Sequence, residues 1–346
     1  MANKAKKILV TGAAGYIGSH TLVELIHNGY ELVSIDNLSN SYASAFEGVK
    51  AITGVQVKNY LIDLCDLAAL RKVFKEEEKI DGIIHFAAKK YVNESVKFPL
   101  LYYHNNLESL INVLQCCAEF EVPNLVFSSS CSVYGNAEHL PVDENCPLAL
   151  PESPYAQTKV IGEQIIQDFV QVNRLKVSLL RYFNPAGAHS SGHLGERPKQ
   201  EALNIVPRIT GAAMGKLPVF QVAGHDYPTR DGTCIRDYIH VSDIAQAHTL
   251  ALEWLIKQED ASLCEVFNLG TGEGHSVLEM INAFEKANQI QLNYSLEARR
   301  AGDVVAIYAD NTKAKNVLHW QPRHSLEEMM RSAWEWEKNL QNKNFD

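Results

Sequence analysis

The feature that most constrains the fold is a glycine-rich turn between an expected strand and an expected helix. An apolar run at residues 7–10 leads into Thr-Gly-Ala-Ala-Gly-Tyr-Ile-Gly-Ser, and an amphipathic segment follows over about residues 19–28. Gly12 permits a tight turn, Gly15 lets backbone amides approach a pyrophosphate, and Gly18 lets the helix pack closely on the sheet. This strand, turn and helix are typical of a dinucleotide-binding unit.

A carboxylate follows the next expected strand. Residues 31–35 are apolar and end at Asp36, about 20 residues after the glycine turn, where dinucleotide-binding folds place the adenosine ribose. A carboxylate there accepts hydrogen bonds from both ribose hydroxyls and repels a 2'-phosphate, so Asp36 favours NAD over NADP. The alternative interpretation is that Asp36 only caps a loop.

Strand-like and helix-like segments then alternate. Strands are expected at residues 57–62, 82–86, 124–127 and 176–180, with helices at 67–78, at about 107–120 and from 154 onward. The alternation predicts an α/β fold, a doubly wound parallel sheet of Rossmann type that binds ligands at the carboxyl ends of its strands. The candidate residues at those ends are Asp63, Phe86, Ala87 and Lys90. We assign the adenine amino group to Asp63 and the cofactor phosphates to Lys90, and interpret His85 as a packed strand-end residue.

The regular alternation weakens after about residue 184. We predict an NAD-binding Rossmann-type domain over residues 1–184, to which later segments return, and a smaller mixed α/β lobe over residues 185–346 that binds substrate. Its long irregular loops are typical of ligand-binding segments. Guanidinium groups match phosphate oxygens, and the candidate diphosphate clamps are Arg236, Arg299 and Arg300. The glycine loop at residues 270–274 is interpreted as a turn, and the segment from His324 as an amphipathic helix that packs on the lobe.

The catalytic candidates are a tyrosine and a lysine at the start of an expected helix, in Ser-Pro-Tyr155-Ala-Gln-Thr-Lys159. Residues four apart lie on one helical face, although this spacing also occurs by chance. A phenol acts as a base near neutrality only if its pKa falls by about 3 units, or about 4 kcal/mol. An ammonium about 4 Å away supplies that order of energy, and an oxidised nicotinamide adds a second positive charge. Ser130, in a serine cluster at a strand end, is placed to bond a substrate oxygen beside Tyr155.

Composition excludes several classes of partner. The chain has 346 residues, 46% hydrophobic content and a formal net charge of -9, which argues against binding to nucleic acid or to an anionic membrane surface. We find no apolar segment long enough to span a membrane and no signal-type N-terminus. The seven cysteines form no CxxC pair. We therefore expect a cytoplasmic protein with reduced thiols, no disulfide and no bound metal.

Together these motifs resemble the extended short-chain dehydrogenase/reductase superfamily. The resemblance rests on the glycine turn, Asp36-Asn37, Ser130, Tyr155-x-x-x-Lys159 and Arg-Tyr-Phe-Asn184. Within the superfamily the chain is most similar to the UDP-glucose 4-epimerases. The segments Ile-Ile-His-Phe-Ala, Arg-Tyr-Phe-Asn-Pro-Ala-Gly-Ala-His and Arg-Asp-Tyr-Ile-His-Val belong to this similarity, which extends over nearly the whole chain.

The resemblance implies an NAD-dependent isomerase of galactose metabolism that interconverts UDP-glucose and UDP-galactose through a transient 4-keto sugar. Tyr155 would remove the proton of the sugar 4-hydroxyl while Ser130 shares that hydrogen bond. With Ser130, Tyr155, Lys159 and the residues assigned above, the NAD site would include Tyr16, Ile17, Asn37, Asn40, Leu64, Ala88, Asn105 and Phe183. The UDP-hexose would be held by Asn184, Asn204, Ile205, Arg236, Arg300 and Asp303. A homodimer through the helices near residues 107–120 and 155–173 is also implied.

Two departures and two alternatives bear on this assignment. Ala88 stands where the family usually has glycine, and Ile307, at a position that selects sugar size, leaves activity on UDP-N-acetylhexosamines open. A sugar-nucleotide 4,6-dehydratase needs an additional acid and base after the strand-end serine, whereas Cys-Ser-Val follows Ser130. A non-catalytic NAD-binding protein would have no use for Ser130, Tyr155 and Lys159 together.

Overall fold

The computed structural model describes residues 5–300 and 303–342. Its largest element is a seven-stranded sheet in the order β10-β6-β5-β4-β1-β2-β3, with every neighbouring pair parallel. The strands are β1 (Lys7–Thr11), β2 (Glu31–Ile35), β3 (Lys58–Tyr60), β4 (Gly82–His85), β5 (Asn124–Ser130), β6 (Lys176–Tyr182) and β10 (Leu263–Leu269). The predicted doubly wound parallel sheet is confirmed.

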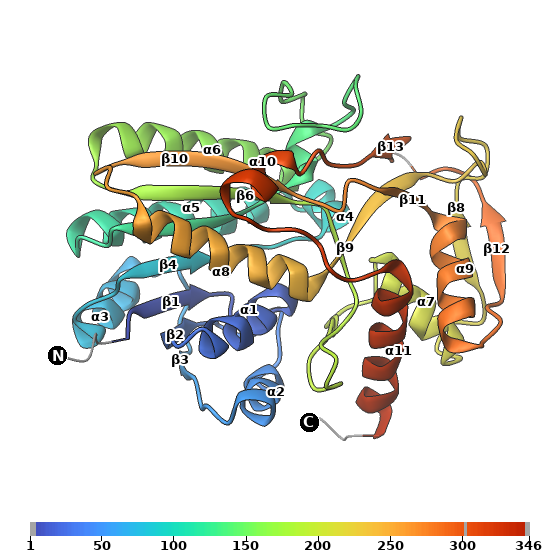
Figure 1. The fold of residues 1–346 in the computed structure, drawn as a ribbon, viewed down its shortest axis with the longest axis horizontal. Coiled ribbons are helices and arrows are strands. Elements are labelled where there is room, and N and C mark those ends of the chain that lie inside the picture. Colours follow the sequence, from blue (N-terminus) through green and yellow to red (C-terminus); the bar gives the residue numbers. More distant parts are fainter. Residues whose placement is uncertain (1–4, 301–302, 343–346) are drawn as a thin grey trace.

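Helices cover both faces of this sheet (Figure 1). Strand side chains alternate, so Ile8 and Val10 of β1 enter one core while Leu9 enters the other. The first core is closed by α1 (Tyr16–His27), α2 (Ser44–Thr53), α8 (Val241–Lys257) and α10 (Thr312–Val317). The second is closed by α3 (Leu67–Glu77), α5 (Pro99–Glu119) and α6 (Pro154–Val172). Both faces of the sheet are therefore buried.

The smaller lobe is built around β9 (Ile235–His240). Its partners are β7 (Asn184–Ala186) and β13 (Ala306–Ile307), both parallel, and β11 (Gly274–Ser276), which is antiparallel. A separate parallel pair joins β8 (Phe220–Ala223) to β12 (Tyr294–Glu297). The helices of this lobe, which Figure 1 shows beside the large sheet, are α7 (Ile205–Ala213), α9 (Val277–Asn288) and α11 (Leu326–Asn342). The mixed α/β character predicted for this part is confirmed, whereas the domain boundary at residue 184 stays a prediction.

Several predicted helix boundaries are wrong. α1 begins at Tyr16 rather than near residue 19, because Gly15 already caps the helix. α5 begins at Pro99, well before the predicted start near residue 107. Its first turns contain Tyr, His and Asn, which are weak helix formers, but Tyr102 and Asn106 are buried, and their packing overrides the propensity. α2 and the short α4 (Val92–Lys97) were not predicted.

Strand boundaries near the catalytic candidates also differ from the prediction. β5 continues past residue 127 to Ser130, because Ser129 and Ser130 pair with Arg181 and Tyr182 of β6, which itself passes its predicted end at residue 180. The serines resemble loop residues in sequence but extend the ladder of the sheet. β3 is shorter than the predicted 57–62 and covers only Lys58–Tyr60. β5 and β6 therefore extend further toward their carboxyl ends than the sequence indicates, whereas β3 ends earlier.

Two interpretations in the second half of the chain agree with the structure. The loop at residues 270–274 is a turn, held by the Asp237 carboxylate, which accepts hydrogen bonds from the amides of Thr271 and Gly272. The amphipathic segment after His324 forms α11, whose Trp334 enters the core of the smaller lobe. Both segments stabilise the lobe.

A buried ion pair joins β6 to α6. Arg181 donates from Nη2 to Glu163 Oε2 at 2.6 Å and from Nε to Oε1 at 3.0 Å. Ser129 Oγ donates to the same Oε1 at 2.5 Å, and Arg181 Nη1 donates to the Tyr134 hydroxyl at 2.9 Å. Burying both charges is costly, so their mutual bonds are needed to offset the loss of hydration.

Removing one partner of this pair is expected to destabilise the fold strongly. Arg181→Met should lower the free energy of unfolding by about 3–5 kcal/mol, because Glu163 is left buried and unpaired. The double variant Glu163→Met/Arg181→Met should recover most of this loss, since an apolar pair of similar volume carries no desolvation cost. Urea denaturation measures both values, and a double variant as unstable as the single one would contradict this account.

Candidate active site

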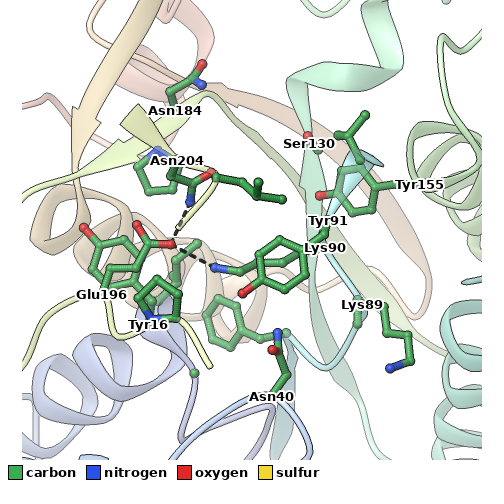
Figure 2. A pocket seen from close by; sticks show the side chains of 18 of the residues that line it. Tyr16, Asn40, Lys89, Lys90, Tyr91, Ser130, Tyr155, Asn184, Glu196 and Asn204 are labelled. Carbon is green, nitrogen blue, oxygen red and sulfur yellow. Dashed lines mark hydrogen bonds and ion pairs between the residues drawn. The ribbon is translucent and has the colours of Figure 1, made fainter. Parts of the chain in front are cut away.

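A cavity of about 670 Å³ lies between the carboxyl ends of the large sheet and the smaller lobe. Apart from Arg299, every residue that the sequence assigns to cofactor or substrate, from Gly12 to Asp303, lies on its wall. Figure 2 shows Tyr16, Lys90, Ser130, Tyr155, Asn184 and Asn204 around this space. The structure thus brings the predicted set together, while the role of each residue stays a prediction.

The glycine turn forms a backbone-lined wall of the cavity. Gly12 has a φ of +66°, and a Cβ placed on it would lie 2.8 Å from the Ala87 nitrogen. A Cβ on Gly18 would collide with the carbonyl oxygen of Gly12. Gly12 thus has the backbone of the predicted tight turn, whereas Gly18 excludes a side chain because it packs on the turn itself rather than on the sheet. The N-terminus of α1 is left accessible to an anion.

Asp36 anchors this turn from the end of β2. Its Oδ2 accepts a hydrogen bond from the Ala14 amide at 2.9 Å, and its Oδ1 accepts from Ser41 Oγ at 2.7 Å and from the Leu38 amide at 2.8 Å. A carboxylate has about four lone-pair sites, so acceptor capacity remains for a ligand hydroxyl. Asp36 is therefore both a structural anchor and a cavity residue.

The catalytic candidates lie at the first turns of α6. Ser153 caps the helix by accepting a hydrogen bond from the Ala156 amide, and Pro154 occupies the first helical turn. Tyr155 and Lys159 are both buried, and the Lys159 ammonium donates to the Ser128 carbonyl at 2.7 Å and lies 6.0 Å from the centre of the Tyr155 ring. Figure 2 shows Ser130 beside Tyr155. The Tyr, Lys and Ser arrangement is thus present as expected.

In the protein without a ligand, burial determines the protonation of Tyr155 and Lys159. It raises the pKa of Tyr155 to about 12, although the hydrogen bond of Ser130 acts in the opposite direction. It also lowers the pKa of Lys159 to about 8, while the nearby Glu163 carboxylate acts in the opposite direction. Lys159 alone therefore does not make the phenol a base near neutrality. A further positive charge is required, as the sequence argument anticipates.

Comparisons with known proteins agree with this geometry. A family model described as GDP-mannose 4,6 dehydratase matches residues 9–333. A UDP-glucose 4-epimerase of Bacillus subtilis is 48% identical over 333 residues, covering 96% of this chain and 97% of the relative. A UDP-glucose 4-epimerase of Drosophila melanogaster is 44% identical and covers 97% of each chain. The chain belongs to the UDP-glucose 4-epimerase family.

Solved structures of epimerases have the same fold. One, from Stenotrophomonas maltophila with bound NAD and formylated UDP-arabinopyranose, superimposes with a TM-score of 0.94 at 43% identity, covering 97% of this chain and 99% of that one. Another, from Bifidobacterium longum in complex with NAD+ and UDP, gives 0.92 at 43% identity over 97% and 99%. Although the family model's description names a dehydratase, Cys131–Tyr134, the short 3-10 helix that follows Ser130, reads Cys-Ser-Val-Tyr and contains no carboxylate. This agrees with the epimerase relatives.

The end of the cavity that lies opposite the glycine turn is rich in arginine side chains. Asp303 pairs with Arg300 at 2.9 Å and with Arg236 at 3.8 Å. Arg208 of α7, which the sequence analysis missed, also lines the cavity, and burial together with the neighbouring Arg300 lowers its pKa. Arg236 and Arg300 thus share the one carboxylate of Asp303, and Arg208 adds a third guanidinium group to the same wall. Such an excess of positive charge suits a diphosphate.

One proposed clamp is wrong, and one cavity carboxylate was missed. Arg299 does not line the cavity but bonds Asp226 at 2.7 Å and lies over the Tyr227 ring. Glu196 does line the cavity, in the irregular segment after β7, and bonds Lys90 and Asn204 (Figure 2). Neither Arg208 nor Glu196 belongs to a motif with a mechanism, so residue spacing gave no signal for them.

Some candidates outside the reaction centre have structural surroundings. His85 shares a hydrogen bond of 2.8 Å with Thr11 and stacks on Phe127, and burial lowers its pKa to about 3, which supports the structural interpretation.

Away from the cavity wall, the side chains of Cys65, His104 and Glu108 lie within 4.8 Å of one another and could act as metal ligands. Among the described residues, no helix is long and apolar enough to cross a membrane.

Lys159→Met is expected to stabilise the protein freed of bound nucleotide while destroying its catalysis. Because burial lowers the pKa of Lys159 from 10.5 to about 8, the charged folded state carries a cost of about 3 kcal/mol below pH 8 that methionine does not carry. As pH rises, the folded chain loses this proton before the unfolded chain does, so the cost disappears by about pH 10.5.

The measurement is urea denaturation of both proteins between about pH 7 and about pH 10. Lys72→Met, on the exposed side of α3, is the matched control and should change little. A stabilisation that stays constant with pH would assign the gain to packing of the methionine rather than to the lost charge.

Proposed function

We propose that this protein interconverts UDP-glucose and UDP-galactose by inverting C4 of the hexose, with NAD as a tightly bound cofactor. The observation that carries the proposal is the position of Tyr155, Lys159 and Ser130 between two ends of one cavity. One end is the glycine turn with Asp36, and the other is the arginine cluster. The relatives named above, described as UDP-glucose 4-epimerases, support the same activity.

The residues at the first end fit NAD. A side chain on Gly12 would collide with Ala87, so glycine leaves backbone-lined space there, and the N-terminus of α1 favours a pyrophosphate. Asp36 keeps acceptor capacity for one ribose hydroxyl, and its negative charge disfavours a 2'-phosphate. When bound there, NAD would supply a hydride acceptor for C4 and a positive charge near the phenol.

The protein residues then divide the remaining work. Tyr155 takes the proton of the 4-hydroxyl and later returns it, and Ser130 shares the hydrogen bond to that oxygen. Lys159 contributes a fixed positive charge that favours the phenolate. The diphosphate is held by Arg236 and Arg300, so that the keto sugar turns over without leaving the cavity. Tight binding of the nucleotide and loose binding of the hexose are both required.

The proposal is tested by incubating the purified protein with UDP-galactose and measuring UDP-glucose without added NADH. Tyr155→Phe should lower kcat by about 100-fold or more, because the proton acceptor is lost, while UDP still binds.

The same assay with UDP-N-acetylgalactosamine decides whether Ile307, which is buried in the cavity wall, admits the larger sugar. A requirement for fresh NADH in each turnover would contradict the closed hydride cycle.

We also infer a cytoplasmic homodimer that acts in galactose metabolism. The outward side of α5 exposes Leu100 at 80% and Ile111 at 39%, and the preceding turn exposes Phe98 at 58%. Large apolar side chains in such numbers on one surface are typical of an interface. Since α6 packs beside α5, the pair of helices offers a continuous surface to a second copy.

The dimer is tested by the double variant Leu100→Glu/Ile111→Glu. It should sediment as a monomer, because four charges would be buried in a two-fold contact. Val55→Glu, at an exposed position after α2 on the other side of the sheet, is the control and should leave the sedimentation unchanged. A wild-type protein that already sediments as a monomer would contradict the inference.

A further inference from the structure

Glu196 places a carboxylate where the proposed function requires two anionic ligands. Its side chain is only 9% exposed and lines the cavity. Like charges repel more strongly where water is excluded, so this carboxylate on its own should weaken the binding of both NAD and a UDP-sugar. We therefore looked for contacts of Glu196 whose benefit to ligand binding offsets this repulsion.

The contacts of Glu196 connect the two parts of the cavity. Its Oε1 accepts a hydrogen bond from Lys90 Nζ at 3.1 Å and another from Asn204 Nδ2 at 2.6 Å. Figure 2 shows both contacts meeting at one oxygen. Lys90 follows β4 of the large sheet, whereas Asn204 is the N-cap residue of α7 in the smaller lobe. A single atom thus links a residue assigned to the cofactor with one assigned to the substrate.

The segment that carries Glu196 is fixed on two further sides. The backbone oxygen of Glu196 accepts a hydrogen bond from Trp336 Nε1 of α11 at 3.0 Å. The Tyr16 hydroxyl, at the start of α1, donates to the carbonyl oxygen of Gly187 at 2.5 Å. The segment is therefore attached to the glycine-turn helix at its beginning and to the last helix at Glu196. This anchoring gives the carboxylate a defined position.

We propose that Glu196 is a positioning residue that couples the cofactor site to the UDP-sugar site, an inference that rests on the proposed function. Its carboxylate holds the Lys90 ammonium at the junction of the two sites and orients the Asn204 amide at the start of α7. The charge of Lys90 offsets the repulsion between the carboxylate and the ligand phosphates. A change at Lys90 is consequently transmitted to Asn204 through the shared oxygen.

Removing the carboxylate separates this proposal from simple charge repulsion. Repulsion alone predicts that Glu196→Gln and Glu196→Ala bind UDP more tightly. The proposal predicts weaker binding, by at least about fivefold for Glu196→Ala, with a smaller loss for Glu196→Gln, which keeps an acceptor for Asn204. The dissociation constant of UDP is measured by titration calorimetry on NAD-loaded protein. An unchanged or tighter dissociation constant in both variants would overturn the proposal.

Kinetics and stability distinguish positioning from general damage. The KM for UDP-galactose should rise in both variants while kcat stays within about threefold, since neither contact involves Tyr155. The urea midpoint of Glu196→Gln, which retains the size of the side chain, should match that of the wild type. Lys89→Met is the matched control, because the Lys89 side chain points away from Glu196 in Figure 2.

A double-mutant cycle tests the coupling itself. Lys90→Met and Asn204→Ala should have non-additive effects on the dissociation constant of UDP when Glu196 is present and additive effects in the Glu196→Ala background. Equal coupling in the two backgrounds would overturn the proposal. If the wild type binds UDP and epimerises while the Glu196 variants bind UDP equally well, only the coupling fails. A wild type that does not bind UDP would instead contradict the proposed function.

Discussion

The burial of the Lys159 ammonium is the constraint on which the rest of the site depends. Its hydrogen-bond partner is the carbonyl oxygen of Ser128 rather than a carboxylate, and burial lowers its pKa to about 8. A charge held in this way is costly, and the surrounding packing has to offset that cost. The pairing of β5 with β6 and the ion pair of Glu163 and Arg181 fix α6 against the strand that supplies this carbonyl. The geometry of the Tyr155 and Lys159 pair is therefore inseparable from the stability of the central sheet.

The cavity carries charged groups at both of its ends. Carboxylates of Asp36 and Asp63 lie at the end built from β2 and β3, where Arg197 lies over the Tyr42 ring, and Arg208 and Arg236 lie at the end built from α7 and β9. A dinucleotide that places ribose hydroxyls at the first end and a sugar nucleotide that places its diphosphate at the second can meet only in the middle. That middle is where Tyr155 and Ser130 lie.

The sequence predicts the regular half of this molecule well, because alternating strands and helices and a glycine turn have strict periodicities. Prediction from sequence fails where tertiary contacts determine the secondary structure or the residues that line the cavity. The first turns of α5 are weak helix formers stabilised by buried Tyr102, and Ser130 lies in a strand because β6 continues beside it. Arg299 and Arg208 are equally plausible from composition, but only Arg208 sits on a helix that faces the cavity. Glu196 lies in an irregular segment that carries no periodic signal.

The raised pKa of Tyr155 explains why such a site removes no proton from a sugar in the absence of its cofactor. In the protein alone burial raises the pKa of the phenol to about 12, so the hydroxyl keeps its proton and removes none from a bound sugar. The nearby ammonium already has a lowered pKa, which limits the positive charge that the chain itself can supply. Positive charge brought by an oxidised cofactor would act in the same dry environment, where electrostatic effects are large. The desolvation that makes the free phenol inert is therefore the same property that makes it responsive to the cofactor.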